Sequence, residues 1–182
     1  MNSTDTAGDL TPPWRPGHRC IVTGSRNWPS AYLEAQTWGT PTDLGVTADI
    51  LVTRVLCEWA ARLPADCNRI TLVHGACTSG LDATVVETEP DLGCELVLEP
   101  HPADWKRCGR GAGPARNLEM ARLGADRCEA FLFGTSRGTM SMIQCAMDHG
   151  IETWATALWR GGRISRAKVD ENVFTEIRRV HG

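Results

Sequence analysis

Two arginines stand near the predicted starts of helices, where a positive side chain is electrostatically out of place. Arg116 follows Gly113-Pro114, and Arg137 belongs to the segment Ser136–Thr139. The amino end of a helix carries about half a positive charge, so a cation there costs roughly 0.3–1 kcal/mol. A bound anion, held by free backbone N–H groups and by the guanidinium groups, would remove that cost. The spacing therefore predicts an anion site between these two helix starts.

Glycine-bearing turns follow two of the predicted strands and carry side chains suited to the same ligand. In Gly24-Ser25-Arg26 the glycine lets the backbone approach a ligand, the serine offers a hydroxyl and the arginine offers a charged fork. Gly75 and Asp82 belong to the turn after the next strand, and Asp82 lies near a helix start. These turns indicate the phosphate of a nucleotide-like ligand. The ordinary alternatives are plain strand-to-loop turns and, for Asp82, a helix cap.

Two further turns add a basic loop and an anion cradle. The stretch 101–114 is locally basic in an acidic chain, and its Trp105 could stack a base. The stretch 134–139 has small residues, free N–H groups and then a helix, and Thr139 could hydrogen-bond a phosphate oxygen. A solvated loop and a plain helix cap are the alternatives. The predicted ligand-binding residues are Gly24, Ser25, Arg26, Gly75, Asp82, Trp105, Arg116, Asn117, Gly134, Arg137, Gly138 and Thr139.

The cysteines and the glycine pattern argue against a metal or a classical dinucleotide cofactor. Eight cysteines are scattered without a C-x-x-C pair or a histidine cluster, so we expect free thiols and no metal site. The G-x-G-x-x-G fingerprint is absent, so NAD binding of that type is not supported. The sequence specifies no cofactor beyond the expected nucleotide-like ligand.

The net charge and the distribution of apolar residues narrow the possible binding partners further. A net charge of −3 and a pI near 5.9 give no global attraction to nucleic acid or to anionic membranes. No run of about 18 apolar residues occurs, and the first nineteen residues lack the apolar centre of a signal peptide. We therefore expect a cytoplasmic protein whose partner is a nucleotide-like small molecule, neither membrane nor nucleic acid. The sequence leaves homo-oligomerisation open.

Five short apolar runs alternate with helical patterns, and both point to one α/β domain. Continuous apolar runs favour buried parallel strands. The predicted strands are Cys20–Thr23, Ile70–His74, Cys94–Leu98, Cys128–Phe133 and Ile151–Ala155. Helical patterns cover 51–63, 81–88, 114–124 and 136–150, and Asp170 could cap a final helix. The alternation predicts a three-layer α/β sandwich with a five-stranded parallel sheet in the order 3-2-1-4-5. Ligands would bind where strands 1 and 4 flank the switch point.

The sequence predicts three segments along the chain: an N-terminal tail, a core domain and a C-terminal segment. Residues 1–18 are expected to form a flexible N-terminal tail, and residues 19–160 the core domain. Residues 161–182 are expected to form a loop and a helix that pack on the same domain. Residues 29–46 form an insertion before the first helix, and the sequence does not decide between a lid and a contact surface.

Taken together, the motifs between residues 19 and 155 resemble one known family. They are Val22–Arg26 with Trp28, Val73–Gly75 with Gly80 and Asp82, Ala103–Trp105, Ala112–Asn117 with Met120, and Arg137–Thr139. This set resembles the YspA (cpYpsA-related) family of the SLOG superfamily. The resemblance implies a Rossmann-like domain that binds nucleotides or nucleotide-derived signals and that is commonly bacterial or phage-borne. It implies no defined reaction.

One branch of that superfamily, the Lonely Guy phosphoribohydrolases, cleaves the N-glycosidic bond of nucleoside monophosphates. Arg116 could correspond to the arginine of these enzymes, and Gly138-Thr139 to the Gly-Thr of their Gly-Gly-x-Gly-Thr-x-x-Glu turn. The position of their catalytic glutamate is Met142 in this sequence. The next acid on that helix, Asp148, lies roughly 9 Å further along the axis, out of the hydrogen-bond reach of the sugar that a catalytic carboxylate needs. Asp104 and Glu119 are the weak substitute candidates. This departure counts against hydrolysis.

Three functions therefore stay open at this point. The first is a sensor or sequestering module for an ADP-ribose-like nucleotide, and the second is a phosphoribohydrolase-like enzyme. The third is single-stranded DNA binding, because the DNA-processing protein A of transformation has a similar core. In the first, Arg116, Arg137, Gly138 and Thr139 bind phosphate, Gly24, Ser25 and Arg26 follow the sugar-phosphate edge, Asp82 or Asn117 binds ribose hydroxyls, and Trp105 stacks the base.

Overall fold

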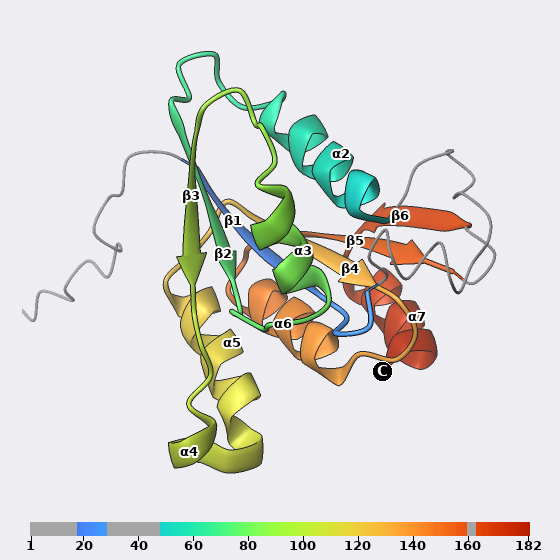
Figure 1. The fold of residues 1–182 in the computed structure, drawn as a ribbon. Coiled ribbons are helices and arrows are strands. Elements are labelled where there is room, and N and C mark those ends of the chain that lie inside the picture. The colour runs from blue at the N-terminus through green and yellow to red at the C-terminus, as the bar shows by residue number, and fades with distance from the viewer. Residues whose placement is uncertain (1–17, 29–47, 160–162) are drawn as a thin grey trace, which may run out of the picture.

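A computed structural model describes residues 18–28, 48–159 and 163–182 of the chain. Its centre is a six-stranded sheet in the order β3-β2-β1-β4-β5-β6 (Figure 1). The strands are β1 (His18–Gly24), β2 (Arg69–His74), β3 (Glu95–Pro100), β4 (Arg127–Leu132), β5 (Glu152–Leu158) and β6 (Ile164–Lys168). The first five are parallel, and β6 runs antiparallel to β5. The N-terminal tail and the insertion expected at 29–46 fall almost wholly outside the described residues.

The sequence-based prediction was right for five parallel strands in the order 3-2-1-4-5 and wrong about their total. Residues 161–182 contain a sixth strand in addition to the expected helix, with Leu158 opposite Ile164 and Trp154 opposite Lys168. The segment Ile164–Lys168 has no continuous apolar run, because it is an edge strand whose side chains are at most half-buried. An apolar-run criterion therefore misses it.

Helices cover both faces of the sheet (Figure 1). On one face lie α2 (Ala48–Ala60) and α3 (Leu81–Thr88), and on the other lie α5 (Ala112–Arg122), α6 (Arg137–Asp148) and α7 (Glu171–His181). A short helix α4 (Trp105–Cys108) and a 3-10 turn (Gly109–Gly111) precede α5. The architecture is a helix–sheet–helix sandwich, consistent with a Rossmann-like fold. No helix of the described parts is long and apolar enough to cross a membrane.

The core forms because alternate strand residues face opposite helix layers. Cys20, Val22 and Phe131 pack toward α2 and α3, and the Phe131 ring meets the Trp28 ring edge-on at a centroid distance of 5.5 Å. Ile21 and Cys128 pack toward α5 and α6. All eight cysteines are free thiols, as expected, and burial raises the pKa of the Cys20 and Cys128 thiols. These thiols behave as small apolar groups.

The start of α5 corrects one electrostatic argument. The helix begins at Ala112, two residues before Pro114, and follows α4 and the 3-10 turn without a break. Arg116 is therefore the fifth residue of α5, past the first turn where the helix dipole acts most strongly. The expectation that Arg116 opens a helix was wrong, because Pro114 need not mark the first helical residue.

Candidate ligand-binding cleft

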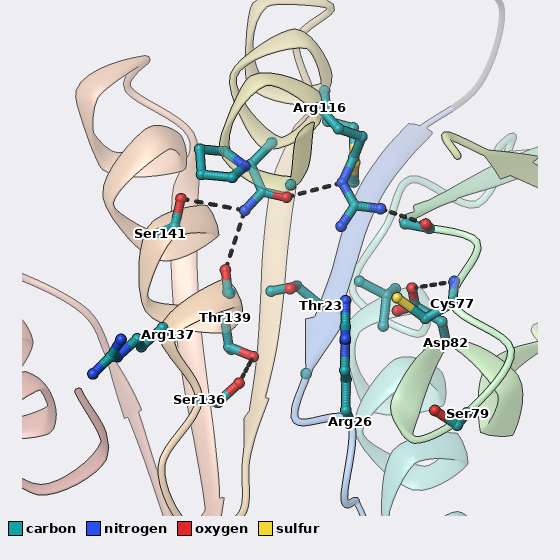
Figure 2. A pocket seen from close by; sticks show the side chains of 18 of the residues that line it. Thr23, Arg26, Cys77, Ser79, Asp82, Arg116, Ser136, Arg137, Thr139 and Ser141 are labelled. Atoms are coloured by element: carbon teal, nitrogen blue, oxygen red, sulfur yellow. Dashed lines mark hydrogen bonds between the residues drawn. The ribbon is translucent and has the colours of Figure 1, made fainter. Parts of the chain in front are cut away.

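A cleft of about 550 Å³ opens beyond the carboxyl ends of β1, β2 and β4 (Figure 2). It lies at the switch point, because β1 pairs with β2 on one side and with β4 on the other. Of the described residues that line it, Arg26, Arg110, Arg116 and Arg137 are basic and Asp82 alone is acidic. The cleft has the size of a small-ligand site, and its charge favours an anion.

Arg116 enters the cleft from α5 and binds the two turns that flank it (Figure 2). Its Nη1 donates hydrogen bonds to the carbonyl oxygens of Gly75 and, at 3.0 Å, of His101. A Cβ at position 75 would lie 1.8 Å from that nitrogen, so glycine leaves the space that the guanidinium fills. Arg116 thus holds the β2–α3 and β3–α4 turns together, and no carboxylate among the described residues offsets its positive charge.

Asn117 links the two helices whose starts border the cleft. Its Oδ1 accepts a hydrogen bond from Arg116 Nε at 3.0 Å. Its Nδ2 donates to the carbonyl of Gly138 at 3.1 Å and to Ser141 Oγ at 3.3 Å. The amide is 4% exposed and its bonds go to the protein. Asn117 therefore positions Arg116 and the α6 start.

The amino end of α6 faces the cleft without a side-chain cap from any described residue. Ser136 occupies the N-cap position, but its Oγ lies 2.7 Å from Thr139 Oγ1. The first-turn N–H groups near Gly138 and Thr139 are thus left for another acceptor. Gly138 and Thr139, two of the predicted ligand-binding residues, both line the cleft. The arrangement can bind a phosphate or carboxylate through backbone N–H groups.

Arg137 lines the same cleft, but its guanidinium does not meet that of Arg116. The side chain is exposed and points away from Arg116 and from the middle of the cleft (Figure 2). The expectation of two arginines that bracket one anion at two helix starts is therefore wrong in its geometry. Among the described residues, the positive charge toward the middle of the cleft comes from Arg116, from the α6 start and from Arg26, with Arg137 at the rim.

The turn after β2 forms the opposite wall. Asp82 Oδ2 accepts a hydrogen bond from the Cys77 N–H at 3.0 Å, so the only acidic lining side chain among the described residues already holds this turn. Gly80 has φ of +70°, and a Cβ there would lie 2.4 Å from the Arg26 carbonyl oxygen. The turn therefore packs directly on the backbone that follows β1.

Arg26 and Trp105 meet across the cleft. The Arg26 guanidinium carbon lies 5.7 Å from the centroid of the Trp105 ring, within cation–π range. Both side chains are exposed, Trp105 at 52%. This pair joins the turn after β1 to α4 and leaves aromatic surface at the cleft.

Two of the predicted site residues, Ser25 and Gly134, do not line the cleft. Ser25 is fully buried and does not line the cleft: its Oγ accepts from the Phe133 N–H at 2.9 Å and ties β1 to β4. Gly134 lines a neighbouring cavity, and Gly24 lines the cleft through its backbone. Ser25 was predicted from its place in a motif, and a buried hydroxyl with a backbone partner has the same sequence signature.

The candidate acids for hydrolysis lie away from the reacting position. Asp104 caps α4 by accepting from the Arg107 N–H at 3.0 Å, and Glu119 is exposed on α5. Neither belongs to the described lining of the cleft. Met142 is fully buried under the sheet. Among the described residues that line the cleft, Asp82 alone carries a carboxylate.

Several lining residues were missed by the sequence analysis. These are Asn27, Cys77, Ser79, Arg110, Thr135, Ser136 and Ser141. Most are small polar residues in turns, and they could have been found by including every residue between the glycines of the two predicted turns. Ser141 lies on α6 and reaches the cleft because it is four residues beyond Arg137.

His74 lies beside the cleft at the end of β2. Burial lowers the pKa of this imidazole, nearby Asp82 raises it, and His101 and Arg116 lower it. Its Nδ1 accepts a hydrogen bond from the Ala76 N–H at 3.3 Å, which requires that nitrogen to be unprotonated. His74 is therefore neutral and helps to fix the turn after β2.

One curated protein gives a partial match. The Gene 61 protein of Mycobacterium phage D29 is 46% identical to this chain over 59 residues, which make up 32% of this chain and 47% of that protein. The match thus spans about half the length of the phage protein. No model of a protein family matches the chain, and no solved structure does.

Proposed function

We propose that this chain binds a phosphorylated nucleoside of the ADP-ribose-like class in the cleft and acts as a sensor or sequestering module. The observation that carries the proposal is the charge of the cleft. Four lining arginines face one lining carboxylate among the described residues, beside a helix start that no described side chain caps. The resemblance of the sequence motifs to the SLOG nucleotide-binding family agrees with this proposal.

The phosphate fits best at the start of α6. There the N–H groups near Gly138 and Thr139 lack a side-chain cap among the described residues, and the helix dipole favours negative charge. Arg116 supplies the nearest fixed positive charge, because the carbonyls of Gly75 and His101 and the amide of Asn117 hold it in place. A guanidinium that is already ordered loses little conformational entropy when the ligand binds.

The nucleoside would extend from there toward the turn after β2. Asp82 Oδ2 is bound to the Cys77 N–H, and a carboxylate accepts several hydrogen bonds, so Asp82 can also accept from a ribose hydroxyl. The Arg26–Trp105 pair offers a cationic and aromatic surface for the base. Recognition therefore combines a charged centre with one aromatic edge.

In this proposal the protein binds the nucleotide and does not cleave it. Hydrolysis of an N-glycosidic bond needs a carboxylate placed against the sugar, and Asp104 and Glu119 are held elsewhere. The enzyme alternative would have to work through Asp82. Release of free base from AMP, measured by chromatography, would replace the binding proposal with that alternative.

A panel of ligands in thermal unfolding tests the proposal. AMP, ADP and ADP-ribose should stabilise the protein, whereas adenosine, which lacks the phosphate, should not. Ligand at 100 times its dissociation constant adds about 2.7 kcal/mol, which is roughly 5–10 °C for a chain of this size. The variant Arg110→Gln should weaken the response, and Arg54→Gln on α2, outside the cleft, should not. An equal response to adenosine and AMP, or none to any phosphorylated ligand, would contradict the proposal.

A further inference from the structure

A second cavity of about 540 Å³ lies beside the cleft, at the carboxyl ends of β4 and β5. Asn27 and Thr135 line both spaces, so the turns after β1 and β4 form their common wall. The cleft extends from this wall toward β2, and the second cavity extends toward β5 and the last turn of α7. The cleft thus lies on the β2 side of the turns at the switch point, and the second cavity lies on their β5 side.

The second cavity is aromatic and carries positive charge. The Arg163 guanidinium carbon lies 5.1 Å from the centroid of the Trp159 ring, and the Trp159 and His181 rings lie 5.0 Å apart. None of its described lining residues is acidic. Aromatic rings beside a guanidinium suit a planar, electron-rich group such as a nucleic-acid base.

The common wall is held by the carboxyl end of α7. His181 Nδ1 donates to the carbonyl of Gly134 at 2.8 Å, and the Ser136 N–H donates to the carbonyl of His181 at 2.8 Å. The imidazole is 3% exposed. These bonds fix the turn that leads into α6, so the second cavity and the proposed phosphate position share one ordered segment.

We propose that the cleft and the second cavity together bind one ligand made of two nucleosides joined through phosphates. The phosphates lie at the α6 start, one nucleoside lies in the cleft, and the second base contacts Trp159 and Arg163. In open α/β sheets a dinucleotide lies across the switch point, with one half on each side. This inference rests on the proposed function, because it needs the phosphate at the α6 start.

Calorimetric titration with matched probes tests the inference. The probes are ADP and 5′,5′-diphosphate-linked dinucleosides of adenosine, guanosine and uridine, each compared with its nucleoside diphosphate. At least one dinucleoside should bind at least tenfold more tightly than its diphosphate. Val180→Trp fills the second cavity, and Arg163→Ala removes its guanidinium, so each should reduce that preference to below threefold and leave diphosphate affinity unchanged. Val86→Trp, at a similarly exposed valine on α3, is the control and should change neither affinity.

The outcomes separate the two proposals. If a nucleoside diphosphate binds and no dinucleoside binds more tightly, the inference is wrong and the proposed function stands. The same holds if Val180→Trp and Arg163→Ala both keep the full preference. If no probe binds the unaltered protein, both proposals fall.

Discussion

Two arginine-rich regions of this molecule use the same side chain in opposite ways. In the sheet, Glu129 is wholly buried and accepts hydrogen bonds from Arg127 at 2.8 Å and from Arg166 at 2.7 and 2.9 Å. Arg127 also bonds Glu152 at 2.6 Å, and both guanidinium groups lie 5.0 Å from the Trp154 ring. Each of these arginines has a carboxylate partner, and together they join β4, β5 and β6.

In the cleft, the arginines outnumber the carboxylates among the described lining residues. Arg116 bonds only to carbonyl and amide oxygens, and Asp82 is occupied by a backbone N–H. The arginines of the Glu129 cluster are thus paired with acids, whereas Arg116 has no carboxylate partner among the described residues. Counter-charge, and not the number of arginines, therefore distinguishes the cluster from the cleft in the described part of the chain.

The largest effect is expected from breaking the structural cluster. Glu129→Gln removes the negative charge between two buried or half-buried guanidinium groups, and we expect a loss of about 3–5 kcal/mol in the free energy of unfolding. Urea unfolding measures it. Glu95→Gln is the control, because its pair with Arg69 is solvent-exposed and should contribute less than about 1 kcal/mol. Equal losses in the two variants would show that Glu129 is no more important than a surface acid.

Removing the fixed charge of the cleft should affect binding more than stability. Arg116→Gln deletes the guanidinium beside the α6 start, and we expect AMP affinity to fall about 10- to 100-fold, the range for a hydrogen bond to a charged group. The measurement is calorimetric titration. Arg69→Gln, outside the cleft, should bind AMP normally. An Arg116→Gln protein that folds and retains full affinity would remove Arg116 from the proposed site.

A carboxylate at the α6 start would give this helix the side-chain cap and the negative charge that it lacks among the described residues. The start of α7 shows the paired arrangement, because Asp170 accepts from the Val173 N–H at 2.8 Å. Ser136→Asp should therefore stabilise the free protein by about 0.5–1 kcal/mol and weaken phosphate binding. Thermal unfolding and titration with AMP measure the two effects. Unchanged affinity together with higher stability would place the phosphate away from α6.

The smallest effect concerns pH. Burial lowers the pKa of His74 from its ordinary value of 6.5, so below pH 6.5 the unfolded chain takes up a proton that the folded protein resists. This contribution to stability is complete above pH 6.5 and is lost as the pH falls toward the lowered pKa. Urea unfolding between pH 7.5 and 5 should show a steeper loss for the unaltered protein than for His74→Gln. Parallel curves would mean that His74 does not contribute to the pH dependence.

How far the sequence could predict this structure depends on whether the deciding contacts are local. The five apolar runs specify strands by themselves, whereas Ile164–Lys168 becomes a strand only because β5 offers an edge. Gly138 and Thr139 were found because a strand–turn–helix motif is local. The role of Arg116 in holding two turns together could not be predicted, because only the fold brings the carbonyls of Gly75 and His101 next to it. Ser25 was misassigned for the same reason: its partner, Phe133, directly follows another strand, β4.

The bond between His181 and the Gly134 carbonyl has a practical consequence for anyone who handles this protein. Because His181, the last residue of α7, holds the turn between the two spaces, a purification tag fused after Gly182 would lie beside the second cavity. Proteolytic removal of α7 would remove the hydrogen bonds that hold the turn after β4, even if the sheet stayed intact. Binding assays should therefore use amino-terminal tags. The mass of the purified chain should be measured first, so that a loss of binding is not caused by a truncated α7.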